Sequence, residues 1–212
     1  MSPAGVPRIE SLSMAGPAGI LEGILRLPPL PPSRAALLCH PHPLYQGSMH
    51  SPVVFRAARA LHRLDFATLR FNYRGVGRSS GSFDSGRGEM DDVRTALEML
   101  TARVPEVPIT LLGYSFGSHV GFEAAAGDPR VRQLVGIGMP VTLWSFDFLK
   151  RIDKPLIVVQ GSEDSLGPLP PLRRLLAEIG PRARLAVLPG ADHFLTADLG
   201  RLEETLYLEI GA

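Results

Sequence analysis

The chain has 212 residues, of which 45% are hydrophobic and 20% are charged, so it can bury a core of its own, and we expect one domain over residues 1–212. Its 22 Lys+Arg nearly balance 21 Asp+Glu, and no run of like charges is long enough to bind along a phosphate backbone. Both features argue against nucleic-acid binding. Apolar runs such as Ala35–Cys39 are far shorter than the roughly 18 residues that cross a bilayer, so we expect no membrane partner. No signal-peptide pattern opens the chain, and its single cysteine cannot form an internal disulfide, so we expect a cytoplasmic protein.

Two short strands open the chain, Ile9–Met14 and Ile20–Leu27, joined by a Gly-Pro-Ala-Gly turn. From residue 34 onward, buried strands alternate with helices. The expected strands are continuous apolar runs: Arg34–Cys39, Phe66–Tyr73, Ile109–Tyr114, Val131–Met139, Leu156–Gly161 and Leu185–Leu188. The expected helices show apolar residues at helical spacing: Ser51–Leu64, a segment with Met90, Val93, Leu97 and Leu100, Phe116–Ala126, and a last helix with Leu199, Leu202, Leu206 and Ile210.

Strands that are apolar on both faces and alternate with helices predict a mostly parallel sheet covered on both sides, because each crossover helix packs back onto the sheet. The fold class is therefore α/β, with a doubly wound sheet. Ligands of such sheets bind beyond the carboxyl ends of the strands. The loops that follow the strands are where function is to be sought.

The pattern G-x-S-x-G occurs twice, around Ser79 in Gly77–Gly81 and around Ser115 in Gly113–Gly117. A nucleophilic serine on a strand-to-helix turn needs a buried strand directly before it and a helix directly after it. Ser115 meets both conditions, and its flanking glycines let strand and helix backbones approach closely. Ser79 meets neither condition, and we expect it in a solvated turn.

A serine hydroxyl needs a base to take its proton, and the base needs an anionic partner. In the chain order of such folds, serine, acid, then histidine, His193 is the candidate base. The acid is Glu163 or Asp164, both just after Leu156–Gly161, and we favour Asp164; Asp192 is the weaker alternative because it is adjacent to the histidine. The other histidines are set aside: His119 lies one helical turn beyond Ser115, and His50 and His62 are expected at the surface.

These residues together resemble the α/β-hydrolase superfamily, and specifically its small bacterial members with an H-P-H-P loop, of the carboxylesterase and dienelactone-hydrolase type. The matching motifs span roughly residues 34–210: His40–Met49, Phe71–Gly77, Gly81–Asp84, Gly113–Gly117, Gly161–Asp164 and Gly190–His193. The resemblance implies a nucleophile at Ser115, an acid at Asp164 and a base at His193. Larger relatives often insert a cap after the sixth strand, where this chain has only the short segment Pro140–Asp153, so we expect no cap domain.

Acyl transfer also needs N–H donors for the oxyanion. We expect one donor at the Phe116 backbone and a second at His42 or Leu44, because Pro41 and Pro43 have no N–H. His42 is favoured, since it stands where relatives have the middle of an H-G-G motif. A metal pair at His40 and His42 is the less favoured alternative, because no further ligands are evident. We therefore expect neither a metal nor a cofactor.

The substrate pocket is expected to include residues beside the nucleophile, in the H-P-H-P loop and in the short segment after the sixth strand: Tyr45, Met49, Tyr114, Leu143, Trp144 and Phe146. The aromatic residues of the last segment could instead belong to the core. The expected function is hydrolysis of small or short-chain carboxylic esters through an acyl-enzyme, by a monomer or a homodimer. Peptidase, thioesterase or acyltransferase chemistry shares the same residues, and a non-catalytic binding protein that retains the fold is the alternative from another class.

Overall fold

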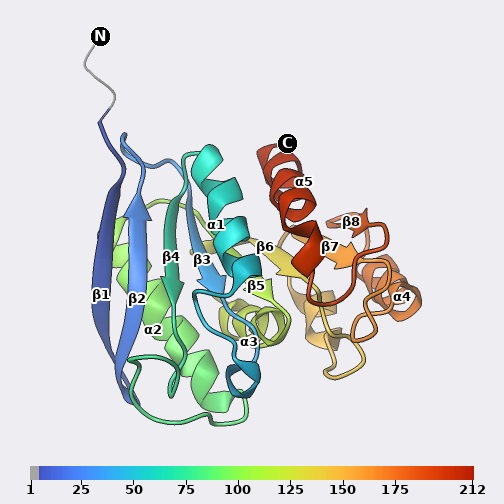
Figure 1. Ribbon diagram of the computed structural model, residues 1–212, viewed down its shortest axis with the longest axis horizontal. Helices are drawn as coiled ribbons and strands as arrows, with labels where there is room; N and C mark the ends of the chain where they lie inside the picture. Colours follow the sequence, from blue (N-terminus) through green and yellow to red (C-terminus); the bar gives the residue numbers. More distant parts are fainter. Residues whose placement is uncertain (1–4) are drawn as a thin grey trace.

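Eight strands form one sheet in the computed structural model, which describes residues 5–212 (Figure 1). The strands are β1 (Arg8–Gly16), β2 (Gly19–Leu27), β3 (Ala35–Cys39), β4 (Ala67–Phe71), β5 (Ile109–Tyr114), β6 (Val131–Ile137), β7 (Leu156–Gly161) and β8 (Ala183–Leu188). Their order across the sheet is β1-β2-β4-β3-β5-β6-β7-β8. The β1–β2 and β2–β4 pairs are antiparallel and every other pair is parallel, so the prediction of a mostly parallel sheet is confirmed.

Helices cover both faces of the sheet. They are α1 (Pro52–Arg63), α2 (Arg87–Arg103), α3 (Phe116–Ala125), α4 (Leu169–Ile179) and α5 (Leu199–Gly211). Helices α1 and α5 lie side by side on one face, where Ala36 and Leu38 of β3 pack in their cluster. The other three apolar side chains of β3, those of Ala35, Leu37 and Cys39, belong to the second core with α2, α3 and α4. Because successive residues of a strand face opposite sides, an apolar run buried on both faces produces this double layer.

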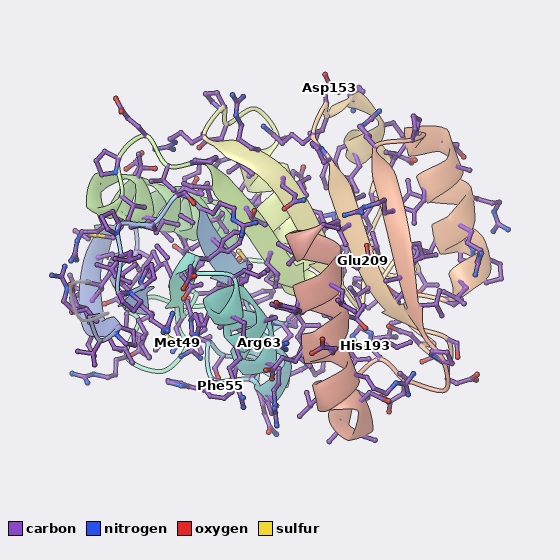
Figure 2. The ribbon with its side chains drawn as sticks, turned by 90° about the horizontal axis from the view of Figure 1, so that it is seen from above. Met49, Phe55, Arg63, Asp153, His193 and Glu209 are labelled. Atoms are coloured by element: carbon purple, nitrogen blue, oxygen red, sulfur yellow. The ribbon has the colours of Figure 1, made fainter. Side chains whose placement is uncertain are left out.

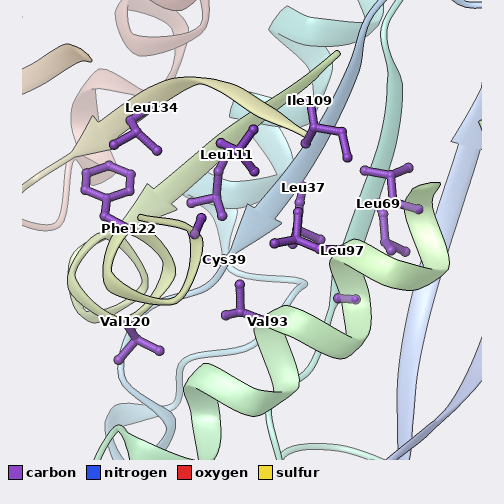
Figure 3. Packing of buried hydrophobic residues seen from close by; sticks show 14 of the residues in the cluster. Leu37, Cys39, Leu69, Val93, Leu97, Ile109, Leu111, Val120, Phe122 and Leu134 are labelled. Atoms are coloured by element: carbon purple, nitrogen blue, oxygen red, sulfur yellow. The ribbon is translucent and has the colours of Figure 1, made fainter. Parts of the chain in front are cut away.

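The core between the sheet and α2 and α3 is closely packed around small and branched side chains (Figure 3). Val93 and Leu97 of α2 and Phe122 of α3 point toward the strands, as the apolar spacing predicts. Cys39 is fully buried among them, and burial raises the pKa of its thiol to about 12. The cysteine therefore acts as a small apolar side chain rather than as a reactive thiol.

The carboxyl ends of β3, β5, β7 and β8 meet at one edge of the sheet, which gathers the loops that carry the candidate residues. In Figure 2, Asp153, which precedes β7, lies at the upper margin of the molecule, and His193, which follows β8, lies well below it. After β6, the segment 140–153 contains only the short 3-10 helix η2 (Asp147–Arg151), so the loop edge has no cap over it. Within residues 5–212, no helix combines the length and apolar character needed to cross a bilayer.

One histidine differs from its predicted surface position. His62 lies on α1 beside β4, and its Nε2 is 2.8 Å from Thr68 Oγ1. Burial, reinforced by the charges of nearby arginines such as Arg26 and Arg70, lowers the pKa of His62 to about 3. The helical face assigned to solvent is therefore partly covered, because the β2–β4 part of the sheet extends beneath it. His50, by contrast, is exposed, as expected.

Candidate active site

Ser115 occupies a strained turn between β5 and α3. Its backbone has φ 53° and ψ −121°, a conformation that side-chain-bearing residues rarely adopt. The turn is fixed by neighbouring backbone, since Ser115 N donates to Ile137 O at 2.9 Å and Ser118 N donates to Ser115 O at 2.9 Å. The structure thus confirms the predicted strand–serine–helix junction.

The glycines on either side of Ser115 are required by contact rather than by backbone conformation. A Cβ on Gly113 would lie 2.4 Å from the Gly117 carbonyl oxygen, and one on Gly117 would lie 2.4 Å from the carbonyl oxygen of Cys39. No side chain fits at these distances. The predicted close approach of strand and helix is therefore observed, and it includes the end of β3 as well.

Three side chains that are distant in sequence form one hydrogen-bonded chain. Ser115 Oγ is 3.0 Å from His193 Nε2, and His193 Nδ1 is 2.8 Å from Asp164 Oδ2. With its proton on Nδ1, His193 donates to Asp164 and accepts from Ser115. The three residues are 8%, 6% and 2% exposed, so their contacts are largely protected from competing water. They come from the loops after β5, β8 and β7, as the sequence predicted.

The two alternative acids take no part in this chain. The Oδ1 atom of Asp192 accepts the N–H groups of Phe194 and Leu195, and so it shapes the loop that carries His193. Glu163 is exposed and is bonded to Ser162. The choice of Asp164 among the three acids agrees with the observed geometry.

The Asp164 carboxylate is held by donors on both oxygens. Oδ1 accepts the backbone N–H groups of Leu166 and Gly167, each at 2.9 Å. Oδ2 accepts from the side chain of Gln160 at 2.8 Å as well as from His193. The sequence analysis missed Gln160; the signal present was a polar residue at the end of an otherwise apolar buried strand.

Tyr114 supports His193 from the side of β5. Its hydroxyl donates to the His193 carbonyl oxygen at 3.1 Å, and the two rings are stacked with centroids 5.9 Å apart. Burial raises the pKa of Tyr114, which keeps the hydroxyl protonated and able to donate. Tyr114 therefore both lines the cleft and fixes the backbone of the histidine loop.

In the H-P-H-P loop, the two candidates for the second oxyanion donor differ in whether their backbone N–H is already hydrogen-bonded. The Leu44 N–H is engaged, since it donates to His42 Nδ1 at 3.2 Å at the start of the short helix η1 (Pro43–Tyr45). The backbone N–H groups of His42 and Phe116, in contrast, have no acceptor among residues 5–212. The rings of His42 and Phe116 pack against each other, with centroids 4.8 Å apart. This arrangement favours His42 over Leu44 as the second donor.

His40 uses both ring nitrogens within the protein. Nδ1 donates to Pro41 O at 2.7 Å and Nε2 accepts the N–H of Tyr73 at 3.1 Å. Burial lowers the pKa of His40 to about 3, so the ring is neutral. In the part of the chain that the structure describes, His40 and His42 have no further residues with which to form a metal-binding group. His40 links the loop after β3 to the segment that follows β4.

An open cleft of about 380 Å³ lies above Ser115 and His193. Four of the predicted pocket residues line it, Tyr45, Tyr114, Leu143 and Trp144, and four others were missed as pocket walls, Pro41, His42, Leu166 and Phe194. Large apolar side chains at its mouth are strongly exposed: Tyr45 (81%), Phe194 (66%) and Leu143 (54%). Apart from His42 and His193, the lining has no ionisable group other than tyrosine hydroxyls.

Two predicted pocket residues are wrong. Met49 is buried away from the cleft, and its N–H donates to Asn72 Oδ1, just after β4, at 2.7 Å. Phe146 is buried in the core, where its ring meets the edge of the His119 ring with centroids 5.3 Å apart. Both residues are drawn inward by partners that are distant in the sequence, which leaves Leu143 and Trp144 as the walls from that loop.

Ser79, the serine of the other G-x-S-x-G motif, is also not in a solvated turn. It is buried, its Oγ donates to Asn72 O at 2.8 Å, and the same oxygen accepts the N–H of Glu22 at 3.0 Å. These bonds attach the loop to β2. The expectation that Ser79 is no nucleophile agrees with this geometry, because its hydroxyl faces backbone and no histidine.

Comparisons with known proteins agree with the fold. Residues 46–145 match a family model described as serine aminopeptidase S33. An α/β serine hydrolase homologue from Coxiella burnetii is 34% identical, with 95% of this chain and 97% of that chain covered and a TM-score of 0.89. An α/β serine hydrolase without lid from Xanthomonas campestris is also 34% identical, covers 96% of this chain and 94% of its own, and has a TM-score of 0.88.

An uncharacterized protein from Rickettsia prowazekii is 34% identical over 188 residues, which cover 84% of this chain and 79% of the relative. The similarity of these relatives extends over most of both chains and is not confined to the serine motif. The chain therefore belongs to the α/β-hydrolase superfamily, among its serine hydrolases.

Proposed function

We propose that the protein hydrolyses small, neutral carboxylic esters through an acyl-enzyme formed on Ser115. The observation that carries this proposal is the buried chain from Ser115 Oγ through His193 to Asp164, with contacts of 3.0 and 2.8 Å. Such a chain activates a hydroxyl by giving its proton a neutral acceptor whose positive charge is then balanced by a carboxylate.

In the first half of the reaction, His193 Nε2 takes the proton of Ser115 as Oγ attacks the ester carbonyl carbon. The carbonyl oxygen becomes an oxyanion and accepts hydrogen bonds from the free N–H groups of Phe116 and His42. Collapse of the tetrahedral intermediate breaks the bond to the alcohol, which leaves with the proton from His193. The acyl group then remains on Ser115 as an ester.

In the second half, His193 takes a proton from water as the water oxygen attacks the acyl carbon. The same two N–H groups stabilise the second oxyanion. Ser115 leaves with the proton from His193, and the carboxylic acid is released. The balance is one ester and one water consumed, and one acid and one alcohol formed.

The lining and volume of the cleft favour an acyl group that is uncharged and small. Its walls are mainly aromatic and aliphatic, and none of its lining residues is Asp, Glu, Lys or Arg, so a charged acyl chain would lose water without gaining a partner. The volume of about 380 Å³ and the absence of a cap leave the alcohol portion open to solvent. An aminopeptidase would need an anion for the substrate ammonium group, and no carboxylate is among the residues that line this cleft.

The test is a series of p-nitrophenyl esters from two to twelve carbons, measured with the wild type and with Ser115→Ala of confirmed folding. We expect the highest kcat/KM below eight carbons and no turnover above background in the variant. A maximum at eight or more carbons contradicts the substrate size. Faster cleavage of aminoacyl p-nitroanilides than of any ester supports a peptidase instead.

A further inference from the structure

Gln160 is a fully buried polar residue on β7 that makes three hydrogen bonds. Its Oε1 accepts the Met139 N–H at 2.9 Å, and its Nε2 donates to Asp164 Oδ2 at 2.8 Å and to Gly167 O at 2.9 Å. A buried amide is stable only when its polar atoms are paired. The residues before it on the strand, Leu156–Val159, are all apolar, so the amide stands out in its surroundings.

The contact with Asp164 involves the oxygen that also binds the histidine. Oδ2 lies 2.8 Å from both Gln160 Nε2 and His193 Nδ1, while Oδ1 is occupied by two backbone N–H groups. Each oxygen of the carboxylate therefore accepts two hydrogen bonds, and the carboxylate cannot rotate without breaking at least one of them. Gln160 and His193 share the negative charge of one atom.

We propose that Gln160 is a positioning residue that fixes Asp164 and keeps His193 from being too strong a base. A hydrogen bond to a carboxylate is strongest when the carboxylate charge is not already neutralised. The Gln160 bond therefore stabilises the state with neutral His193 more than the state with imidazolium. When the amide donor is lost, the negative charge of Asp164 is stabilised by fewer hydrogen bonds and interacts more strongly with the His193 imidazolium. His193 then keeps its proton to a higher pH.

The other groups around His193 and Asp164 do not change with Gln160. The Tyr114 hydroxyl is neutral and donates to the His193 carbonyl oxygen. Asp192 is exposed and accepts two backbone N–H groups of its own loop, Glu163 is exposed, and His42 lines the same cleft as His193. A change in the pH profile of a Gln160 variant can therefore be attributed to the lost donor.

The inference rests on the proposed function only in taking His193 as the base of Ser115. Its test measures the rate at which a fluorophosphonate modifies Ser115 from pH 5 to 9, alongside kcat/KM for p-nitrophenyl butyrate, in the wild type and in Gln160→Met. Methionine has similar length but cannot donate. We expect the midpoint of the acid limb to rise by about 0.5–1 pH unit in both measurements.

The matched control is Gln133→Met on β6, where the amide oxygen accepts from Thr110 Oγ1 at 3.2 Å, outside the contacts of the active site. Its acid limb is expected to coincide with that of the wild type. If Gln160→Met is not folded, Gln160→Asn replaces it, because an amide one methylene shorter leaves Asp164 Oδ2 out of reach. A lower plateau with an unmoved acid limb overturns the proposal and leaves Gln160 a purely structural role.

A second measurement combines Gln160→Met with Asp164→Asn in one variant. In an Asp164→Asn background the carboxylate charge is absent, so Gln160→Met is expected to leave the acid limb of Ser115 modification where it is. A shift of similar size in that background also overturns the proposal. A wild type that the fluorophosphonate modifies but that cleaves no ester contradicts the proposed ester substrate, while the test of Gln160 continues on the modification rate alone.

Discussion

The two G-x-S-x-G motifs of this chain have the same residue spacing and opposite backbone requirements. Around Ser79, the positive φ angles fall on the glycines, Gly77 (58°) and Gly81 (81°). Around Ser115, the positive φ falls on the serine itself (53°), and the glycines are needed because backbone atoms approach within 2.4 Å of where a Cβ would be. In the first motif the glycines supply conformational freedom and their nearest neighbours are side chains, whereas in the second they supply space between backbone segments.

The elements around each motif produce this difference. Ser115 lies between a buried parallel strand and a helix, which lift its hydroxyl toward the histidine loop. Ser79 lies in the long loop between β4 and α2, where its hydroxyl bridges Asn72 and Glu22. A motif of five residues is therefore informative only together with the strand and helix that flank it.

The largest expected difference is in activity. Ser115→Ala is expected to reduce kcat/KM for a short p-nitrophenyl ester by about 1,000-fold or more, because the nucleophile is lost. Ser79→Ala is expected to retain activity within about threefold and to lose about 1–2 kcal/mol of unfolding free energy, because two backbone groups lose their partner. Steady-state kinetics and urea unfolding of both variants check this. Equal losses of activity would contradict the distinction between the motifs.

A glycine replacement probes the space requirement. Gly117→Ala is expected to lower the free energy of unfolding by about 3 kcal/mol or more, because the new Cβ meets carbonyl oxygens of Cys39 and His40 that cannot move independently. Gly81→Ala is expected to cost about 1–2 kcal/mol, because of its positive φ and because the new Cβ would lie 2.9 Å from Ala18 Cβ. Gly127→Ala is the control, since nothing lies within 4 Å of its added Cβ. Urea unfolding in which Gly117→Ala matches the control would contradict the packing argument.

The His42 side chain tests the assignment of the second oxyanion donor. His42→Phe keeps the aromatic contacts but removes the acceptor for the Leu44 N–H, and we expect kcat to fall by about 10- to 100-fold with a smaller change in KM. Asparagine is a good acceptor at the start of a helix, so His42→Asn is expected to retain most of the activity. Equal rates for the phenylalanine variant and the wild type would leave Leu44 as the better donor.

Acid is expected to destabilise the chain in part through His40, which joins the loop after β3 to the segment that follows β4. Its pKa is about 3 in the folded chain and about 6.5 in an unfolded chain, so the unfolded state binds the proton first and stability falls as pH drops below 6.5. The contribution is about 2 kcal/mol at pH 5 relative to pH 7. His40→Gln, whose amide oxygen can still accept the Tyr73 N–H, is expected to lose less stability over that interval. Urea unfolding at pH 7, 6 and 5 measures both slopes, and parallel slopes would exclude His40 as the titrating group.

Much of the fold and the central residues of the site could be predicted because their signals are local. Continuous apolar runs such as Leu156–Val159 fix strands buried on both faces, and Ser115 stands at the end of one of them. Parallel strands bring their carboxyl ends to one edge, so His193 and Asp164 could be placed near Ser115 from chain order alone. Strand ends depend on more distant contacts: the apolar run predicts a strand through Tyr73, but β4 ends at Phe71, and the Tyr73 N–H donates to His40 instead.

The remaining features depend on partners that sequence spacing does not reveal. Met49 and Phe146 carry apolar side chains suited to a pocket, and only the contacts of Asn72 and His119 show that they face inward. Ser79 is buried by a bond to the backbone of Glu22, which lies 57 residues earlier. The cleft walls at Leu166 and Phe194 likewise follow from how their loops turn, which in turn follows from bonds to Asp164 and Asp192.

The positive φ of Ser115 sets stability against activity at a single residue. A side-chain-bearing residue in this conformation is strained by about 1–3 kcal/mol, and glycine at the same position is not. Ser115→Gly is therefore expected to melt at a higher temperature than Ser115→Ala, although both lack a nucleophile. Selection for thermal stability alone would favour loss of the serine, so its presence in so strained a turn is a trade-off in which the chain gives up part of its folding energy to keep a reactive hydroxyl in place.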